Sequence, residues 1–115
     1  MSEWTSKKLI EEGYTIENAR IVDVKFTPVD DTCSTFDIDL YGISWEGTYG
    51  KFTVSTVGSD CYEKLEAVFN IMRIAGAESF ADMEGKYVRV AYKDFMTKIS
   101  VIGNIIDEKW VEFRY

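Results

Sequence analysis

Apolar and polar residues alternate along the segment 34–43, most regularly over 36–40. Phe36, Ile38 and Leu40 occupy every second position, and the intervening Asp37 and Asp39 are charged. Because successive side chains of a β-strand point to opposite faces, this alternation predicts a strand with one buried face and one solvated face. Burial on one face only is typical of antiparallel sheets, so the chain is expected to form one.

The C-terminal segment Gly85–Ile106 has the pattern of a β-hairpin. Two runs of β-branched and aromatic residues surround a turn at 93–97. A short last strand is expected over 110–113. Over 45–57 another strand is expected, in which the apolar phase slips by one residue. That slip predicts a β-bulge at Gly50.

A first strand is expected over 14–27, ending at Pro28 because proline cannot donate to a β-ladder. Simple alternation places Val22, Val24 and Phe26 together on one face of this strand. The turn that follows is rich in aspartate, whose side chain readily bonds the local backbone.

Two segments follow helical spacing. The first, over 3–12, is short, and Gly13 stands where a left-handed cap would end it. The main helix, over 60–74, begins at a capping signal and ends before Gly76. A single helical turn is expected from Ser79. The apolar stripe of the main helix consists of Leu65, Val68, Phe69, Met72, Ile74 and Ala75.

The order of these elements predicts an α+β fold. We expect an antiparallel, curled sheet of five to six strands or an OB-like barrel, with the main helix between strands three and four and a short N-terminal helix. A length of 115 residues suits one domain over 1–115. The expected core consists of Phe36, Ile38, Leu40, Val68, Phe69, Met72, Val88, Val90 and Val101.

The chain is acidic, with 20 Asp and Glu against 13 Lys and Arg and a net charge of −7. Such a balance repels free nucleic acid and favours a basic protein partner or simply solubility. The absence of histidine removes the commonest general base and zinc ligand. No phosphate-binding motif occurs. The chain is therefore predicted not to be an enzyme, with no catalytic residues, cofactor or metal.

The number of cysteines and the hydropathy of the chain indicate the cellular compartment of the protein. Cys33 and Cys61 are too few and too scattered for a disulfide framework, so both are expected to be free thiols in a reducing compartment. No apolar run approaches the ~20 residues that a membrane-spanning helix needs, and the N-terminus lacks the apolar core of a signal peptide. A cytoplasmic location, without membrane contact, is predicted.

Three carboxylates are expected on the solvated face of the first two strands, namely Asp23, Asp37 and Asp39. Residues i and i+2 of a strand lie roughly 6–7 Å apart, a spacing comparable to adjacent phosphates of nucleic acid. The cluster has three interpretations: a solvated face with Lys25 as partner, a hard-cation site, or a mimic of phosphates.

Aromatic and basic residues offer two further candidate surfaces. Tyr41, Trp45 and Tyr49, with Lys51, are either a platform on which bases stack or part of the core. The basic residues that concentrate near the last hairpin are Arg73, Lys86, Arg89, Lys93 and Lys98. Of these, Arg89, Lys93 and Lys98 would line one rim of the hairpin or simply keep an edge soluble.

Four runs of sequence resemble a family of small proteins carried by tailed bacteriophages and prophages. They are IENARIVDV, GISWEGTYGKF, RIAGAESFADMEGKYVRV and IGNIIDEKWVEF, and the resemblance covers Ile16–Phe113. The chain departs from the family pattern over 49–56, where a glycine pair and an extended acidic loop are expected. The resemblance implies a phage-borne setting, in which small acidic proteins include inhibitors of host defence such as anti-CRISPR proteins.

These considerations favour a phage-encoded inhibitor of a bacterial defence system in the host cytoplasm, binding a basic protein surface through an acidic face that mimics nucleic acid. The alternatives are an OB-like accessory protein that binds single-stranded nucleic acid and a structural or assembly protein. Direct nucleic-acid binding is disfavoured by the charge. The expected partner-binding residues are Asp23, Asp37, Asp39, Tyr41, Trp45 and Glu46.

Overall fold

A computed structural model describes residues 3–42, 46–55, 57, 61–94 and 99–112, with the backbone alone described over 46–53. The helices are α1 (Ser6–Glu11), α2 (Cys61–Ile74) and the 3₁₀ turn η1 (Ala81–Met83). The strands are β1 (Thr15–Pro28), β2 (Cys33–Gly42), β3 (Glu46–Ser55), β4 (Tyr87–Tyr92), β5 (Val101–Asn104) and β6 (Trp110–Glu112).

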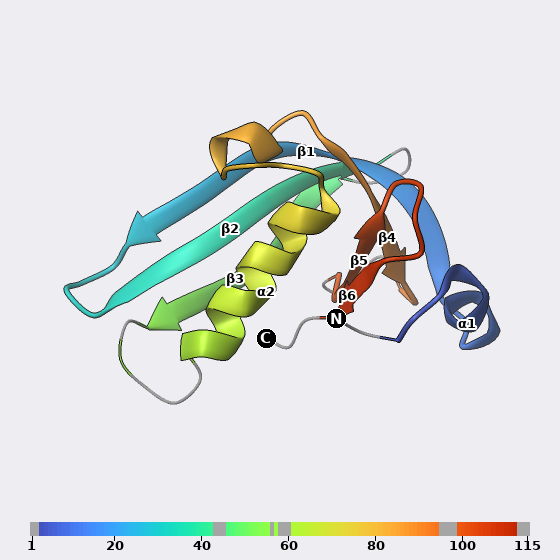
Figure 1. The fold of residues 1–115 in the computed structure, drawn as a ribbon, viewed down its shortest axis with the longest axis horizontal. Coiled ribbons are helices and arrows are strands. Elements are labelled where there is room, and N and C mark those ends of the chain that lie inside the picture. Colours follow the sequence, from blue (N-terminus) through green and yellow to red (C-terminus); the bar gives the residue numbers. More distant parts are fainter. Residues whose placement is uncertain (1–2, 43–45, 56, 58–60, 95–98, 113–115) are drawn as a thin grey trace.

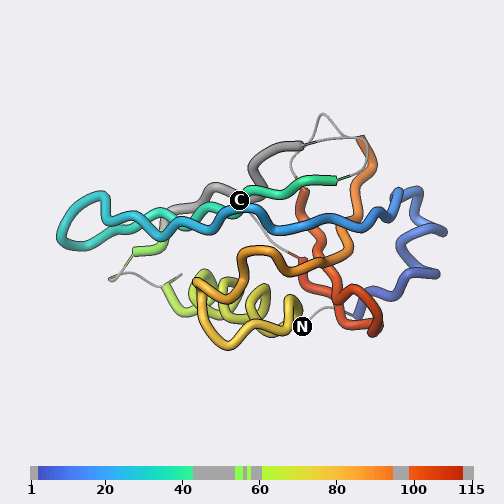
Figure 2. Tube along the Cα trace, turned by 90° about the horizontal axis from the view of Figure 1, so that it is seen from above, coloured from blue at the N-terminus to red at the C-terminus, as the bar shows by residue number. Residues whose placement is uncertain are grey.

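The six strands form one antiparallel sheet in the order β3-β2-β1-β4-β5-β6. The sheet curls along the length of β1, and α2 lies across its concave side (Figure 1). Seen from above, α2 and η1 occupy one side of the β1–β2 layer, and α1 lies at the opposite end of the molecule (Figure 2). Because β3 and β6 are the two edges, the open curled sheet, rather than a closed OB-like barrel, is the predicted form that is found.

The main core fills the space between α2 and the concave face. Phe36, Ile38 and Leu40 are buried there, which confirms the prediction from their alternation. Helix α2 contributes Val68 and Ile71, and the latter was missing from the predicted stripe. The remaining members from the other strands include Ala19, Ile21, Val54, Val88, Val90, Ile102 and Val111.

Two predicted core residues are placed elsewhere. Phe69 is 41% exposed, because α2 presents Val68 and Ile71 to the sheet and turns Phe69 toward its flank. Val101 is fully buried, but in a second cluster on the other side of the sheet, where it packs with Leu9 and Trp110. The prediction was therefore wrong about the burial of Phe69 and about the partners of Val101.

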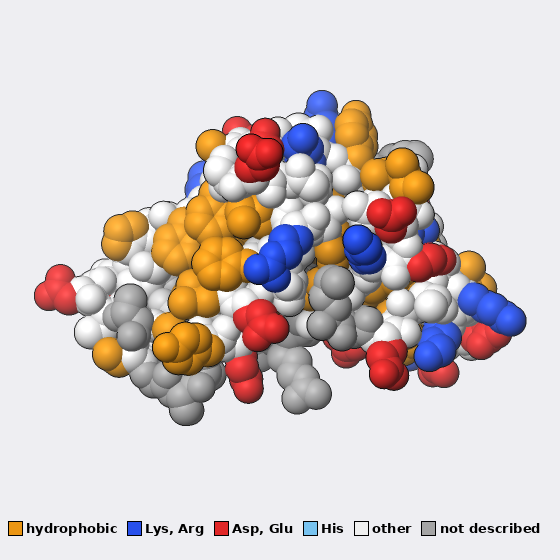
Figure 3. All heavy atoms as spheres, viewed as in Figure 1, with side chains coloured by type: hydrophobic (Ala, Val, Ile, Leu, Met, Phe, Trp, Pro, Cys, Tyr) orange, Lys and Arg blue, Asp and Glu red, His pale blue; other side chains and the backbone are white. Residues whose placement is uncertain are grey.

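Apolar side chains gather on the visible face of the molecule beside α2 (Figure 3). The Phe26 ring, 41% exposed, stacks on Phe80 with the ring centroids 5.9 Å apart. Both rings also contact Phe36, at centroid distances of 6.1 and 5.9 Å. This aromatic group joins β1, β2 and the segment before η1.

Two bulges set which residues face the core. The β2–β3 register shifts between Asp37 and Ile38, where Gly50 is the extra residue, as the apolar phase predicted. A second shift in β1 lies between Ile21 and Asp23, and Val22 is exposed there. The predicted grouping of Val22 with Val24 and Phe26 was therefore wrong, because one extra residue moves Ile21 to the inner side with them.

Local side-chain contacts hold the turns. Asp30 Oδ1 accepts hydrogen bonds from the Thr32 amide at 2.8 Å, the Thr32 hydroxyl at 2.9 Å and the Cys33 amide at 2.9 Å. The bonds from Thr32, followed by that from Cys33, lower the pKa of Asp30.

Gly13 and Gly76 take positive φ values of 93° and 73° as predicted for left-handed caps. Cys33 and Cys61 are free.

Candidate functional site

The convex side of β1 and β2, called here the outer face, carries the predicted acidic residues. The inner positions of β2 are occupied by Phe36, Ile38 and Leu40, so Asp37 and Asp39 fall on the outer face. Of the described helices, α2 lies on the concave side, and α1 packs through Leu9 at the far end of the sheet. Helix α1 covers the start of β1 at Ile16, so the part of the outer face that holds the predicted acidic residues carries no described helix.

Asp23 and Asp39 are direct register partners across β1 and β2. We call these two residues the acidic pair. Directly opposed side chains on antiparallel strands lie roughly 4.5–5.5 Å apart at their Cβ atoms, and like charges there are destabilising. Lys25 Nζ lies 3.4 Å from Asp23 Oδ2, and so it offsets part of this repulsion. Both aspartates are half-buried.

Asp37 is in a different environment from the acidic pair. Its register partners are Lys25 on β1, the lysine that the solvated-face interpretation names, and Lys51 on β3. Its Oδ1 atom is buried and has no hydrogen-bond partner within the described residues. A buried oxygen cannot contact a docked partner. Asp37 can therefore offer a docked partner Oδ2 but not Oδ1.

Of the other predicted binding residues, one lies on the outer face and two have side chains outside the described part of the chain. Tyr41 lies on the outer face with half of its surface exposed, next along β2 from Asp39. Glu46 is the backbone register partner of Tyr41, and its side chain lies outside the described part. Trp45 falls outside the described residues. The structure therefore brings together four of the six predicted residues: Asp23, Asp37, Asp39 and Tyr41.

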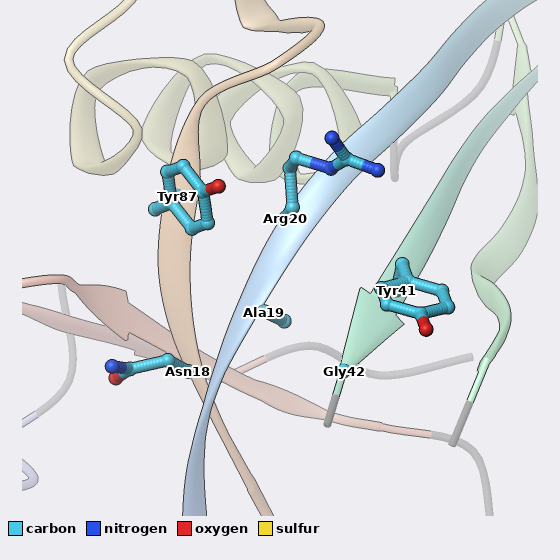
Figure 4. A pocket seen from close by; sticks show the side chains of 6 residues that line it. All are labelled: Asn18, Ala19, Arg20, Tyr41, Gly42 and Tyr87. Carbon is cyan, nitrogen blue, oxygen red and sulfur yellow. The ribbon is translucent and has the colours of Figure 1, made fainter. Parts of the chain in front are cut away.

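A row of three exposed residues continues the outer face away from the acidic pair. Arg20 of β1 is the register partner of Tyr41 on β2 and of Tyr87 on β4. The two rings are 50% and 56% exposed, and they lie on either side of Arg20 (Figure 4). They border a hollow of about 460 Å³. Its lining consists of Asn18, Ala19, Arg20, Tyr41, Gly42 and Tyr87.

Sequence reasoning missed Arg20 and Tyr87. Alternation backward from Asp23 gives no warning, because the bulge at Val22 reverses the face on which Arg20 lies. A signal existed for Tyr87, which stands at an outward position of the predicted hairpin strand beside buried Val88. What the sequence lacks is the pairing of β1 with β4, which joins residues that are far apart in the chain.

The predicted basic rim of the last hairpin is not formed by Arg89. Its guanidinium Nε donates to the Asn104 carbonyl at 2.7 Å, and Nη2 donates to the Asp107 carbonyl at 2.8 Å. The side chain is only 16% exposed. Arg89 is therefore a structural residue. Lys93 lies with Nζ 5.0 Å from the centre of the Tyr14 ring, and Lys98 is outside the described residues.

Among the described residues, no three Cys, Asp or Glu side chains come together as a group able to hold a metal ion, so the cation interpretation of the aspartates finds no support. In the same part of the chain, the helices are all too short or too polar to cross a bilayer. Comparison of the chain with protein-family models and with curated proteins gives no match.

Proposed function

We propose that the protein is a binding protein whose outer face docks on a basic surface of another protein. The observation that supports it is the direct opposition of Asp23 and Asp39 on a part of the outer face that no described helix covers. Like charges directly opposed on neighbouring strands are destabilising. A cationic group of a partner placed between the two carboxylates would turn this repulsion into attraction.

Neighbouring residues fit the same role. Tyr41 follows Asp39 on the outer face and is half exposed, and tyrosine is among the residues that dominate the binding energy of interfaces. The net charge of −7 would speed the encounter with a basic partner through long-range attraction. Such steering weakens as salt is raised, because exposed charges are screened.

The resemblance to phage-borne proteins supplies the setting of this proposal. In that setting the protein is an inhibitor, and its partner is a nucleic-acid-binding component of a bacterial defence complex. Carboxylates of the outer face occupy lysine and arginine positions that otherwise hold phosphates. Inhibition is then by occlusion, without chemical change to the partner.

Binding of a single nucleic-acid strand along the outer face is the alternative function. The Tyr87–Arg20–Tyr41 row favours it, since bases stack on exposed rings and arginine pairs with phosphate. The acidic pair opposes it, because a strand running along β1 and β2 would carry its phosphates over two carboxylates. Docking on a protein is therefore the function that we propose.

The test is capture of partners from a bacterial lysate with three immobilised proteins. They are the parent, the double variant Asp23→Asn with Asp39→Asn, and a control double variant Glu11→Gln with Glu12→Gln. The control removes the same charge from exposed positions at the end of α1. We expect the parent and control to retain the same basic protein, which elutes with salt, and the outer-face variant to lose it.

Equal retention by all three proteins, or equal loss from both variants, would contradict the proposal. The first result would mean that the outer face is only solvated, and the second that net charge alone drives capture. The Asn variants keep the shape of aspartate and an acceptor oxygen. They are therefore expected to fold, and relief of the repulsion raises their thermal midpoint slightly or leaves it unchanged.

A further inference from the structure

The hollow beside the acidic pair is bordered by one basic and two aromatic side chains. Its three exposed side chains come from three adjacent strands, with Arg20 of β1 between Tyr87 of β4 and Tyr41 of β2. Adjacent strands lie about 4.8 Å apart, so the backbones that carry the two tyrosines are about 10 Å apart. Register partners share a face of the sheet, and all three side chains therefore project over the same opening.

Arg20 carries a positive charge that the described part of the protein leaves without a counterion. None of the described carboxylates forms an ion pair with its guanidinium, and none of the described acceptors takes a hydrogen bond from it. This is unusual in a chain with seven more acidic than basic residues. The five N–H donors of an exposed arginine match the oxygens of a phosphate in a planar fork.

The tyrosines add aromatic surface beside that charge. Each ring is at least half exposed, and each can stack against a planar ligand or donate its hydroxyl. Asn18 adds an amide that can both donate to and accept from the edge of a base. A phosphate beside a planar base is the ligand that uses all of these groups.

The size of the hollow limits the ligand. A volume of about 460 Å³ lies within the range of roughly 300–1,000 Å³ for small-molecule sites. It is enough for one nucleotide. A second nucleotide in the direction of the β1–β2 turn would bring its phosphate over Asp23 and Asp39, three residues or fewer from the row. Those carboxylates repel it.

We propose that the Tyr87–Arg20–Tyr41 hollow binds one nucleoside phosphate. Arg20 pairs with the phosphate, and a tyrosine ring stacks on the base. The acidic pair ends the site after one nucleotide. Arg20 and Tyr87 lie outside the acidic pair, and of the three residues in the row only Tyr41 is shared with the proposed docking surface.

The test is titration of the full chain, followed by amide NMR shifts and calorimetry, with AMP, adenosine, inorganic phosphate and a short oligothymidylate. We expect AMP to bind more tightly than adenosine or phosphate, and the oligonucleotide to bind no more tightly than a mononucleotide. The AMP-dependent shifts are expected at the residues that line the hollow.

Matched variants assign the site. Arg20→Gln is expected to weaken AMP about tenfold or more, a change of about 1.4 kcal/mol. Arg73→Gln removes an exposed arginine from α2, on the concave side, and is expected to leave the affinity unchanged. Tyr87→Leu and Tyr41→Leu are expected to weaken AMP and to leave the affinity for phosphate as it is. All four positions are exposed, so melting curves should match the parent.

Four results would overturn the proposal. They are no AMP binding at millimolar concentration, phosphate binding as tightly as AMP, an oligonucleotide binding much more tightly than AMP, and an Arg73→Gln effect equal to that of Arg20→Gln. The second would reduce the hollow to an anion site, and the third would extend it to a strand-binding surface. The acidic-pair variant tests protein docking, and its loss of partner capture would not change the expected binding of AMP. The nucleotide proposal and the docking proposal can therefore fail separately.

Discussion

The guanidinium carbon of Arg89 lies 4.8 Å from the centre of the Trp110 ring. The two residues stand on β4 and β6, and Gly103 of β5 is the register partner of both. The ring of Trp110 occupies the space that a side chain on Gly103 would take, since a Cβ there would lie 2.4 Å from Trp110 Cε3. A strand glycine between a cation and an indole is therefore what allows Arg89 to reach Trp110.

Replacing Gly103 with alanine is expected to destabilise the protein by about 1–3 kcal/mol, the usual cost of overpacking a filled core. Trp110 cannot simply move away, because it is 1% exposed and its Nε1 donates to Glu108 at 2.8 Å. Chemical denaturation measures the change. In a Trp110→Leu background the same Gly103→Ala change should cost much less. Equal costs in both backgrounds would show that the indole does not restrict this position.

Arg89→Lys is expected to cost about 1–3 kcal/mol even though charge is kept. Lysine cannot reproduce the donors that bind the Asn104 and Asp107 carbonyls and the Ser6 hydroxyl. The control is Arg73→Lys, whose guanidinium bonds, among the described residues, the Asn70 side chain one turn earlier in α2. That change should stay within about 0.5 kcal/mol. Similar urea midpoints for the two variants would mean that Arg89 is not a structural residue.

The carboxylate of Glu108 makes the stability of this group of residues depend on pH. It accepts hydrogen bonds from Trp110 Nε1 and from the Ser6 hydroxyl at 2.8 Å each, and Arg89 lies 3.4 Å away. These contacts, the one from Trp110 foremost, lower the pKa of Glu108 below its ordinary value of 4.5. A carboxylate with a lowered pKa contributes stability above its unfolded value, and this contribution is lost as pH falls through the folded value.

Glu108→Gln is therefore expected to be less stable than the parent at neutral pH, with the difference shrinking below pH 4.5. Thermal midpoints measured from neutral to acid pH give this difference directly. Glu11→Gln removes the same charge from an exposed position of α1 and is the control. A gap between parent and Glu108→Gln that stays constant with pH would contradict the assignment of the titrating group.

Much of the fold follows from local patterns. The alternation of Phe36, Ile38 and Leu40 predicted the inner face of β2. The phase slip at Gly50 predicted a bulge, because one extra residue in one strand is the simplest way to restore the phase. A glycine at position 76 predicted the end of α2, and its φ in the structure is positive, as a left-handed cap requires. Each of these signals acts within a few residues, which is why sequence alone contains it.

The candidate site was less predictable, because it depends on register between distant strands. The bulge at Val22 has no phase slip as clear as that at Gly50, since Val22 and Val24 are both apolar. That bulge places Arg20 opposite Tyr41, and pairing with β4 adds Tyr87. Lys51 was linked to base stacking from its neighbours, whereas its register partner is Asp37. Periodicity gives the face of a residue and not the identity of its cross-strand neighbour.

Two phenylalanines that the sequence predicted to be core residues differ in their burial in the structure. Phe36 is fully buried between Phe26 and Phe80, so Phe36→Ala is expected to cost about 3–5 kcal/mol through lost burial and the cavity left behind. Phe69 is 41% exposed, and Phe69→Ala removes only part of a ring from contact, at about 1–2 kcal/mol.

The measurement is the urea midpoint of both variants with the slope of the transition as a check on cooperativity. The ratio matters more than either value, because both variants remove the same atoms and differ only in surroundings. If Phe69→Ala costs as much as Phe36→Ala, the ring is buried in solution. Dilution then decides how, since burial between two copies of the chain makes the midpoint depend on protein concentration, while burial against the sheet does not.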